Sequence, residues 1–245
     1  MSRRKRISNK LLLVLFLVTS GIGLITVKAL AAGKVFLPLI INQKIYSTPT
    51  MTPMPQGVFL LDNSTHYIDS SNYANIFGEV LNNTTSIIRL VRVVARIYDA
   101  TGHEIGNDAD FSYLDNFLPG DKSCIFMRFR LPVDYASFAL DQPTYSSDGI
   151  QEPSMGIDQE IGFWNIPLNA YSVSGLVINQ HGATVQDVEA IVTLYNHEQG
   201  VVGCGVTSTT PAVIGAGQTG SFSILFSGSF FQQAESFHVQ VNSTP

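Results

Sequence analysis

Basic residues and cysteines are scarce in this chain of 245 residues, and tryptophan occurs once. Charged residues make up 13% of the sequence, against about 25% in ordinary soluble domains. No lysine or arginine follows Arg130, whereas ten acidic residues do. From residue 32 onward, 8 basic residues face 19 acidic ones, a net charge of −11. Generic nucleic-acid binding needs cations against phosphate, so nucleic acid is excluded as a partner.

The cysteines are Cys124 and Cys204, too few for the disulfide framework of a small secreted domain. No Cys-x-x-Cys pair occurs, and no cluster of cysteine and histidine has zinc-binding spacing. The internal repeat described below puts the two cysteines at unrelated positions of its copies. We therefore expect two free thiols and no disulfide.

Signatures of catalysis are also missing. The chain contains no GxSxG, SxxK or HExxH motif and no glycine-rich phosphate loop. Acidic and amide groups at 107–110, with Asp99, Glu104 and Asp115 nearby, offer oxygens for calcium, but their spacing is not that of an EF-hand, and we predict no metal site. We expect no catalytic residues, no cofactor and no enzyme. A glycosidase, which needs only two carboxylates, is the enzyme class that these patterns leave open.

The first 32 residues have the order of an export signal. An uncharged run over 11–27 follows the basic residues Arg3, Arg4, Lys5, Arg6 and Lys10, and a small-x-small pattern at 29–31 comes after it. This segment is either a signal peptide that is removed or a retained membrane anchor, and it is the only part that we expect to contact a membrane. Residues 33–56 alternate proline with threonine and methionine near their end, which predicts a semi-rigid extended spacer.

An internal repeat with an offset of 97 residues organises the rest of the chain. Three landmarks keep this register: the segment 78–82 returns at 175–179, 97–99 returns at 194–196, and Gly120 returns as Gly217. Such a long period indicates two whole domains in tandem. We place the first at 57–140, a polar, turn-rich linker at 141–156, and the second at 157–245.

Apolar and polar residues alternate within each copy, as in strands with one buried face. The apolar positions include Val91, Val93, Ala95 and Ile97 in the first copy, and Val188, Ala190, Val192 and Leu194 in the second. No convincing helical stripe occurs after residue 56. The predicted fold is therefore all-β: two tandem immunoglobulin-like sandwiches.

Phe163 and Trp164 lie near the start of the second copy. We expect them to form a first strand that packs on its own core. A solvent-facing platform for sugars and a wedge between the two domains are the alternatives.

The Gly-x-Val-x-Asn strand and the later Leu-Tyr-Asp strand end resemble the FxLYD domain family of exported bacterial proteins. The motif positions are occupied by Gly78, Asn82, Tyr98 and Asp99 in the first copy and by Gly175, Asn179, Tyr195 and Asn196 in the second. Asn196 stands where the motif has Asp, and Ile97 stands where it has Leu. The motif's Phe is replaced by Ala95 and Val192. The resemblance implies an immunoglobulin-like sandwich, and it implies no catalytic or ligand-binding residues.

Four arginines of the first copy, Arg92, Arg96, Arg128 and Arg130, have outward parity on two predicted strands. If these strands share a sheet, the protein has one basic face and a candidate anion-binding site, because arginine presents a planar fork of donors. We expect a secreted or membrane-anchored structural or adhesive protein of the cell surface. The alternative is a module that binds carbohydrate or wall polymer through this basic face. The expected partner is an envelope polysaccharide or a protein.

Overall fold

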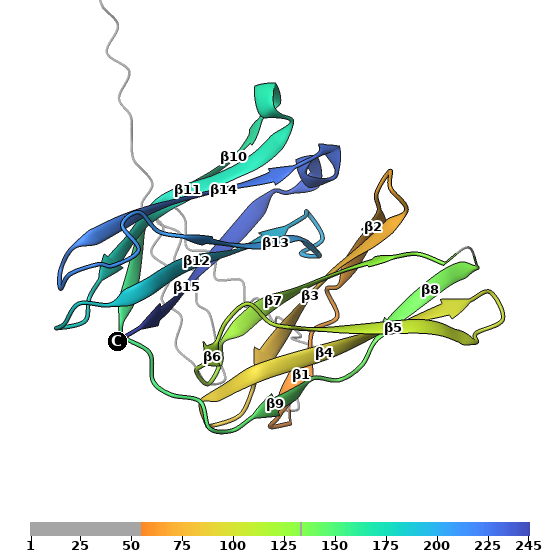
Figure 1. The fold of residues 1–245 in the computed structure, drawn as a ribbon, viewed down its shortest axis with the longest axis horizontal. Helices are drawn as coiled ribbons and strands as arrows, with labels where there is room; N and C mark the ends of the chain where they lie inside the picture. Colours follow the sequence, from red (N-terminus) through yellow and green to blue (C-terminus); the bar gives the residue numbers. More distant parts are fainter. Residues whose placement is uncertain (1–54, 133) are drawn as a thin grey trace, which may run out of the picture. The chain divides into compact units, whose positions relative to one another are not determined.

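A computed structural model describes residues 55–245 except Val133. The export segment and most of the spacer, predicted over 1–32 and 33–56, lie outside this part of the chain. The described residues are nearly all strand (Figure 1), so the predicted all-β class is confirmed. Only two short 3-10 helices occur among them, η1 (Ile166–Leu168) and η2 (Ser229–Gln233), and neither has the length or hydropathy to cross a membrane.

The first repeat consists of β1 (Val58–Leu60), β2 (Thr65–Ile68), β3 (Tyr73–Asn82), β4 (Ile88–Asp99), β5 (Glu104–Phe111), β6 (Asn116–Phe117), β7 (Lys122–Arg130), β8 (Tyr135–Leu140) and β9 (Thr144–Ser146). The second consists of β10 (Met155–Asn165), β11 (Ala170–Asn179), β12 (Gln186–Tyr195), β13 (Val201–Ser208), β14 (Thr219–Ser227) and β15 (Ser236–Thr244).

Each repeat is a sandwich of two antiparallel sheets. In the first, sheet A holds β1, β2 and β7 around β3, and sheet B holds β5, β6, β8 and β9 around β4. In the second, sheet C has the order β10-β11-β14, and sheet D has the order β13-β12-β15. Strand β9 pairs with β4, so part of the segment predicted as a linker over 141–156 belongs to the first sandwich.

The strand registers confirm the 97-residue offset. Gly78 on β3 pairs with Ile125 on β7. Gly175 on β11 pairs with Phe222 on β14, and both residues of this second pair lie 97 positions after those of the first. The β4–β5 and β12–β13 ladders also agree, and both shift register just before the tyrosine of the motif, Tyr98 or Tyr195. The two copies therefore share these two strand pairings residue by residue.

The alternating apolar residues fill the sandwich interiors, as expected. Val91, Val93 and Ala95 on β4 are fully buried, as are Val188 and Ala190 on β12. The side chains that face them come from the partner sheet of the same repeat, for example Ile125 and Met127 on β7 and Phe222 on β14. Burial of such side chains supplies most of the stabilisation of each sandwich.

Part of the outer face of sheet A is buried as well, because β13 of sheet D and η2 of the second repeat cover it. Strand β13 packs against β2, β3 and β7. The Tyr67 ring stacks on Phe230 with centroids 4.0 Å apart, and Phe77 stacks on Phe126 at 5.0 Å. The two sandwiches thus form part of one compact unit, 53–245.

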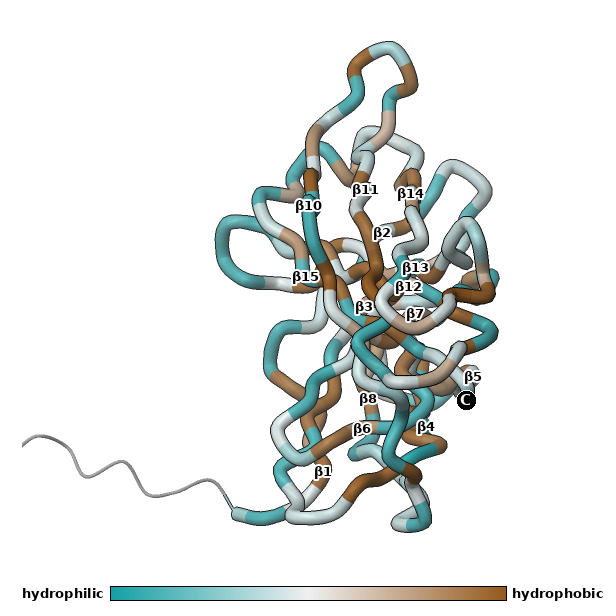
Figure 2. Tube along the Cα trace, turned by 90° about the vertical axis from the view of Figure 1, so that its left-hand side faces the viewer, coloured by the Kyte–Doolittle hydropathy of each residue, from teal (hydrophilic) through white to brown (hydrophobic). Residues whose placement is uncertain are grey.

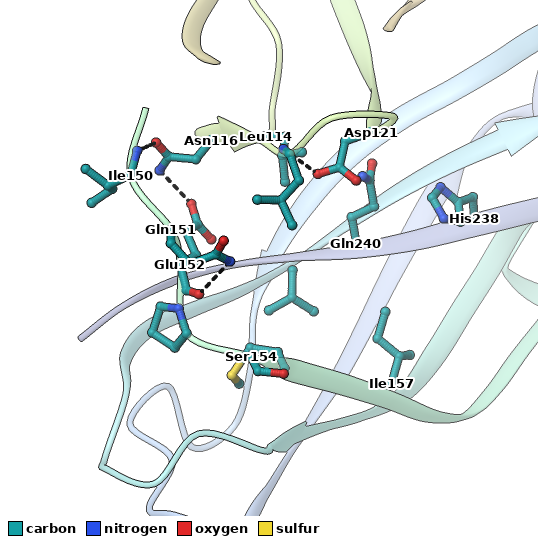
Figure 3. Close-up of a pocket in the computed structure, with 14 residues that line it drawn as sticks. Leu114, Asn116, Asp121, Ile150, Gln151, Glu152, Ser154, Ile157, His238 and Gln240 are labelled. Atoms are coloured by element: carbon teal, nitrogen blue, oxygen red, sulfur yellow. Dashed lines mark hydrogen bonds between the residues drawn. The ribbon is translucent and has the colours of Figure 1, made fainter. Parts of the chain in front are cut away.

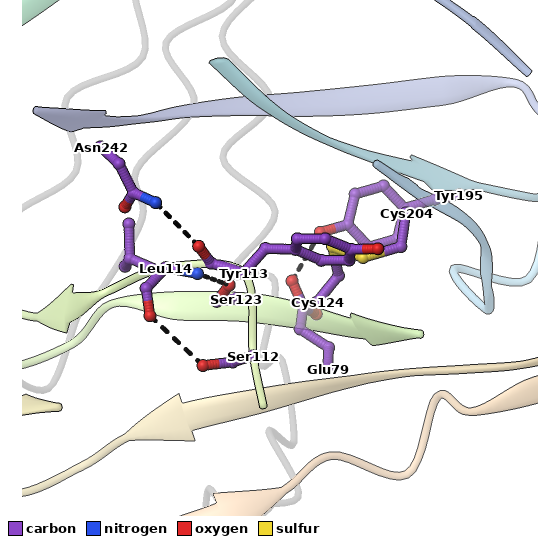
Figure 4. The surroundings of a disulfide bond; sticks show 9 residues. All are labelled: Glu79, Ser112, Tyr113, Leu114, Ser123, Cys124, Tyr195, Cys204 and Asn242. Carbon is purple, nitrogen blue, oxygen red and sulfur yellow. Dashed lines mark hydrogen bonds between the residues drawn. A yellow bond between two sulfur atoms is a disulfide. The ribbon is translucent and has the colours of Figure 1, made fainter. Parts of the chain in front are cut away.

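The prediction of two free thiols is wrong. Cys124 on β7 and Cys204 on β13 form a disulfide (Figure 4), with Cα atoms 6.0 Å apart. This separation lies within the range that a disulfide spans. The repeat offset compares positions within one sandwich, whereas the bond joins the outer faces of two sheets that pack against each other. Unrelated positions in the two copies become neighbours for this reason.

Candidate functional site

The four arginines predicted to form one basic face lie on two different sheets. Arg92 and Arg96 are on β4 in sheet B, whereas Arg128 and Arg130 are on β7 in sheet A. All four point away from the core of the first sandwich, as their parity predicted, but opposite sheets of a sandwich have outer faces that look in opposite directions. A single anion-binding face made by these four residues is therefore not formed.

Carboxylates already hold two of these arginines. Arg96 lies 2.9 Å from Glu104 and 2.8 Å from Asp141, and both contacts raise the pKa of its guanidinium. Arg128 pairs with Asp69 at 2.7 Å, and this hydrogen bond lowers the pKa of Asp69 to about 2. Arg92 and Arg130 are exposed and make no ion pair within the part of the chain that the structure describes.

The motif asparagines Asn82 and Asn179 tie the end of one strand to a loop. The buried amide of Asn82 donates to the carbonyls of Ser86 at 2.9 Å and Phe117 at 3.0 Å. The Asn179 amide donates to the carbonyls of Ala183 and Ile214, both at 2.8 Å. These two residues are the equivalents of Ser86 and Phe117 in the second repeat. These side chains add a hydrogen bond to backbone carbonyls of the loop and so fix the loop against the end of the strand.

Asp99 and Asn196 hold the turn after the central strand of sheets B and D. The Asp99 carboxylate accepts from the backbone N–H groups of Thr101 at 2.8 Å and His103 at 3.0 Å. Asn196 accepts at the equivalent positions 198 and 200. Such local hydrogen bonds are typical of Asp and Asn at turns, and the motif residues act here on the backbone.

The two motif glycines lie under a large side chain of the paired strand. A Cβ at Gly175 would approach the Phe222 ring within 2.8 Å, and at Gly78 it would approach the smaller Ile125 at 3.4 Å. The absence of a side chain at each glycine leaves space for the core residue on the paired strand. This space is tightest in the second repeat, where that residue is Phe222.

The motif tyrosines have different surroundings. Tyr195 reaches across to the first repeat, where its hydroxyl donates to the carboxylate of Glu79 at 2.6 Å (Figure 4). The second Glu79 oxygen accepts from the Asn63 amide at 2.9 Å. Burial, and then Glu79, raise the pKa of Tyr195. Glu79 is 1% exposed and makes no ion pair with any described residue. Sequence reasoning missed this contact, although Glu79 is a charged residue inside an otherwise apolar motif.

The acidic segment 107–110 lies on β5 and is not a loop that could wrap around a cation. Glu104 pairs with Arg96, and Asp99 is engaged in its own turn. Among the described residues, no group of three or more metal-ligating side chains could hold an ion.

A polar cleft runs along the junction of the repeats. It consists of two neighbouring hollows of about 400 and 520 Å³, which share Asp121, His238 and Gln240. Figure 3 shows the first hollow, with Asn116 and Glu152 at one side and Ile157 at another. The Glu152 carboxylate accepts from the Asn116 amide at 2.8 Å and from the backbone N–H of Ser243 at 3.2 Å. Burial raises the pKa of both Glu152 and Asp121.

No family model and no curated protein matches this chain. Among solved structures, red sea bream transglutaminase is similar over 76% of this chain and 29% of its own length, with 10% identity and a TM-score of 0.25. The exo-chitosanase CsxA of Amycolatopsis orientalis is similar over 75% of this chain and 26% of its own, with 9% identity and a TM-score of 0.27. The chain thus spans less than a third of either structure, and such scores carry no argument for either activity.

Proposed function

We propose that this chain is a non-catalytic exported protein that presents two linked immunoglobulin-like sandwiches at the cell surface in a structural or adhesive role. The basic residues, apolar run and small residues of 1–32 support export. The Pro/Thr-rich spacer over 33–56 would hold the folded part at a distance from the membrane or wall. The FxLYD resemblance points to the same class of exported bacterial proteins.

The observation that carries this proposal is the disulfide between Cys124 and Cys204. Structural disulfides form and persist in oxidising compartments and are rare in the cytosol. This one joins the two repeats to each other, and it is accompanied by the Tyr195–Glu79 hydrogen bond. A covalent crosslink between the packed sheets resists their separation under load, which suits a display role.

The polar side chains of the repeats support a structural role. Asn82, Asn179, Asp99 and Asn196 hold backbone groups, and Arg96 and Arg128 are neutralised by carboxylates. Each of these groups is engaged inside the protein.

A carbohydrate-binding role is the second candidate, and the polar cleft favours it. The amides of Asn116 and Gln240 and the carboxylate of Asp121 line a space of about 400 Å³. Amide and carboxylate groups of this kind hydrogen-bond to hydroxyls of small ligands. This site would take the place of the arginine face.

The main proposal can be tested by expressing the full chain in a bacterial host and locating it by fractionation and by protease treatment of intact cells. We expect the chain outside the cytoplasm, with no thiol that reacts with maleimide after denaturation. A matched variant without residues 1–32 should stay inside with two reactive thiols. Cytoplasmic retention of the full chain with two free thiols would contradict export. Envelope polysaccharide retained by the immobilised full chain, but not by Asp121→Asn with Gln240→Ala, would favour the second candidate.

A further inference from the structure

The β10–β11 hairpin carries an exposed apolar turn. Its residues 166–168 form the 3-10 helix η1, in which Ile166 is 79% exposed and Leu168 is 56% exposed. Further exposed apolar side chains follow down β10 at Phe163 and Ile161. In Figure 2 the hairpin leads away from the neighbouring strands. Scattered apolar residues on a surface are ordinary, but several on one projecting turn indicate a contact site.

The backbone of this turn satisfies its own hydrogen bonds. The Leu168 N–H donates to the Asn165 side chain at 3.3 Å, and the Asn169 N–H donates to the Ile166 carbonyl at 3.1 Å. Pro167 has no N–H to satisfy, and the Asn169 carbonyl accepts from Gly228 at 2.8 Å. A segment that enters an apolar medium has to pair its backbone groups internally, and this turn pairs most of them.

The turn is also electrically neutral. No Asp, Glu, Lys or Arg occurs between Glu160 and Asp187. Glu160 precedes Asn165 by five strand residues, a distance of roughly 17 Å along the hairpin. This is about two screening lengths at physiological salt, so the charges of its own hairpin are largely screened at the turn.

The size of the apolar tip distinguishes between two kinds of partner. A stable protein interface buries roughly 800 Å² on each side, usually on a broad patch with a polar rim. The two aliphatic side chains of the turn, even together with the exposed Phe163 and Ile161 on β10, offer only a fraction of that area. Shallow insertion into a lipid interface requires only a few apolar side chains, especially when another part of the chain already holds the protein at the membrane.

We propose that the β10–β11 turn inserts Ile166 and Leu168 into the interface of a lipid bilayer, independently of lipid charge. The inference rests on exposure, internal hydrogen bonding and neutrality of the turn, and it does not depend on the proposed structural role. The class of ligand is a zwitterionic phospholipid surface. Insertion is driven by burial of the two side chains, so it is insensitive to salt.

Trp164 provides the readout, because it is the only tryptophan and lies two residues from Ile166. The full chain is mixed with phosphatidylcholine vesicles, with and without bromine on the acyl chains, and tryptophan emission is measured. Quenching by the brominated acyl chains reports only on the depth of Trp164, whatever else holds the chain at the vesicle. We expect brominated lipid to reduce emission about twofold, at low and high salt and without gain from added phosphatidylglycerol.

The decisive variant is Ile166→Ser with Leu168→Ser, which should abolish the quenching. Val213→Ser is the matched control, because Val213 is 52% exposed on a different loop, and its quenching should equal that of the wild type. Thermal unfolding verifies that each variant folds. Absence of quenching in the wild type, or equal quenching in the double variant, would overturn the proposal. So would a wild-type dimer in lipid-free solution that the double variant loses, since the turn would then bind a second copy.

Discussion

Loss of the Cys124–Cys204 bond should lower the free energy of unfolding by about 3–4.5 kcal/mol. The two cysteines are 80 residues apart in the sequence. The chain-entropy relation for a closed loop of this length gives about 4.5 kcal/mol at 25 °C as the upper end, and measured values usually fall below it. For a unit of this size the same loss corresponds to a fall in Tm of roughly 10 °C.

The measurement compares urea unfolding of the oxidised protein with that of protein unfolded and refolded under a reductant. Both forms keep the two sulfur atoms in place, so the difference isolates the crosslink from packing. The variant Cys124→Ala with Cys204→Ala adds the loss of two buried side chains, since Cys124 is fully buried and Cys204 is 7% exposed, and should be at least as unstable as the reduced form. Equal stability of the oxidised and reduced proteins, within about 1 kcal/mol, would refute the reasoning.

Three further predictions concern single side chains. Tyr195→Phe should cost about 1.5–3 kcal/mol in urea unfolding, because it removes a hydrogen bond to the buried Glu79 carboxylate, whereas Tyr98→Phe, the equivalent change in the first repeat, should be close to neutral. Asn82→Ala and Asn179→Ala should each cost about 2–3 kcal/mol, and unequal losses would argue against their equivalence. Asp69 has a pKa of about 2, below its ordinary 3.8, so its contribution to stability is present above pH 3.8 and disappears as the pH falls towards 2; Asp69→Asn should flatten that part of an acid titration followed by circular dichroism.

Much of the fold could be predicted from the sequence because its evidence is local. Alternation of apolar residues identifies strands, and the offset of 97 relates the two copies. The registers of β3 with β7 and of β11 with β14 follow that offset without a slip. Strand β15, the equivalent of β8, departs from the offset by two residues. Tyr98 pairs with Ser137 on β8, whereas Tyr195 pairs with Ser236 on β15, two residues beyond the position that the offset gives. The helix η2 lies before β15, at the point where this extra length enters.

The candidate site was harder to predict because it depends on how the sheets are placed. Alternation shows whether a side chain points inward or outward, but it does not show which sheet a strand joins. Arg96 and Arg128 therefore had the right parity and different sheets. The disulfide was missed for a related reason. No periodic pattern in the sequence shows which outer faces of two sheets pack against each other. The sequence does place an aromatic residue, Phe77, at an outward position of β3, and the structure buries it there beside Glu79.

The contact between the repeats also explains why two sandwiches form a closed pair. By the 97-residue offset, sheet A corresponds to sheet C and sheet B to sheet D, so packing of A on D is a heterologous contact that further copies could extend. The residues that make the contact in sheet A are Phe77, Glu79, Cys124 and Phe126, and their equivalents in sheet C are Ser174, Leu176, Ser221 and Ser223. On the opposing side of the contact, Thr193 of sheet D is buried. Its equivalent in sheet B is Arg96, which is paired with Asp141. Serines and a leucine on one face and a paired arginine on the other replace the aromatic, hydrogen-bonding and covalent elements of the contact, so the outer faces of B and C do not repeat it.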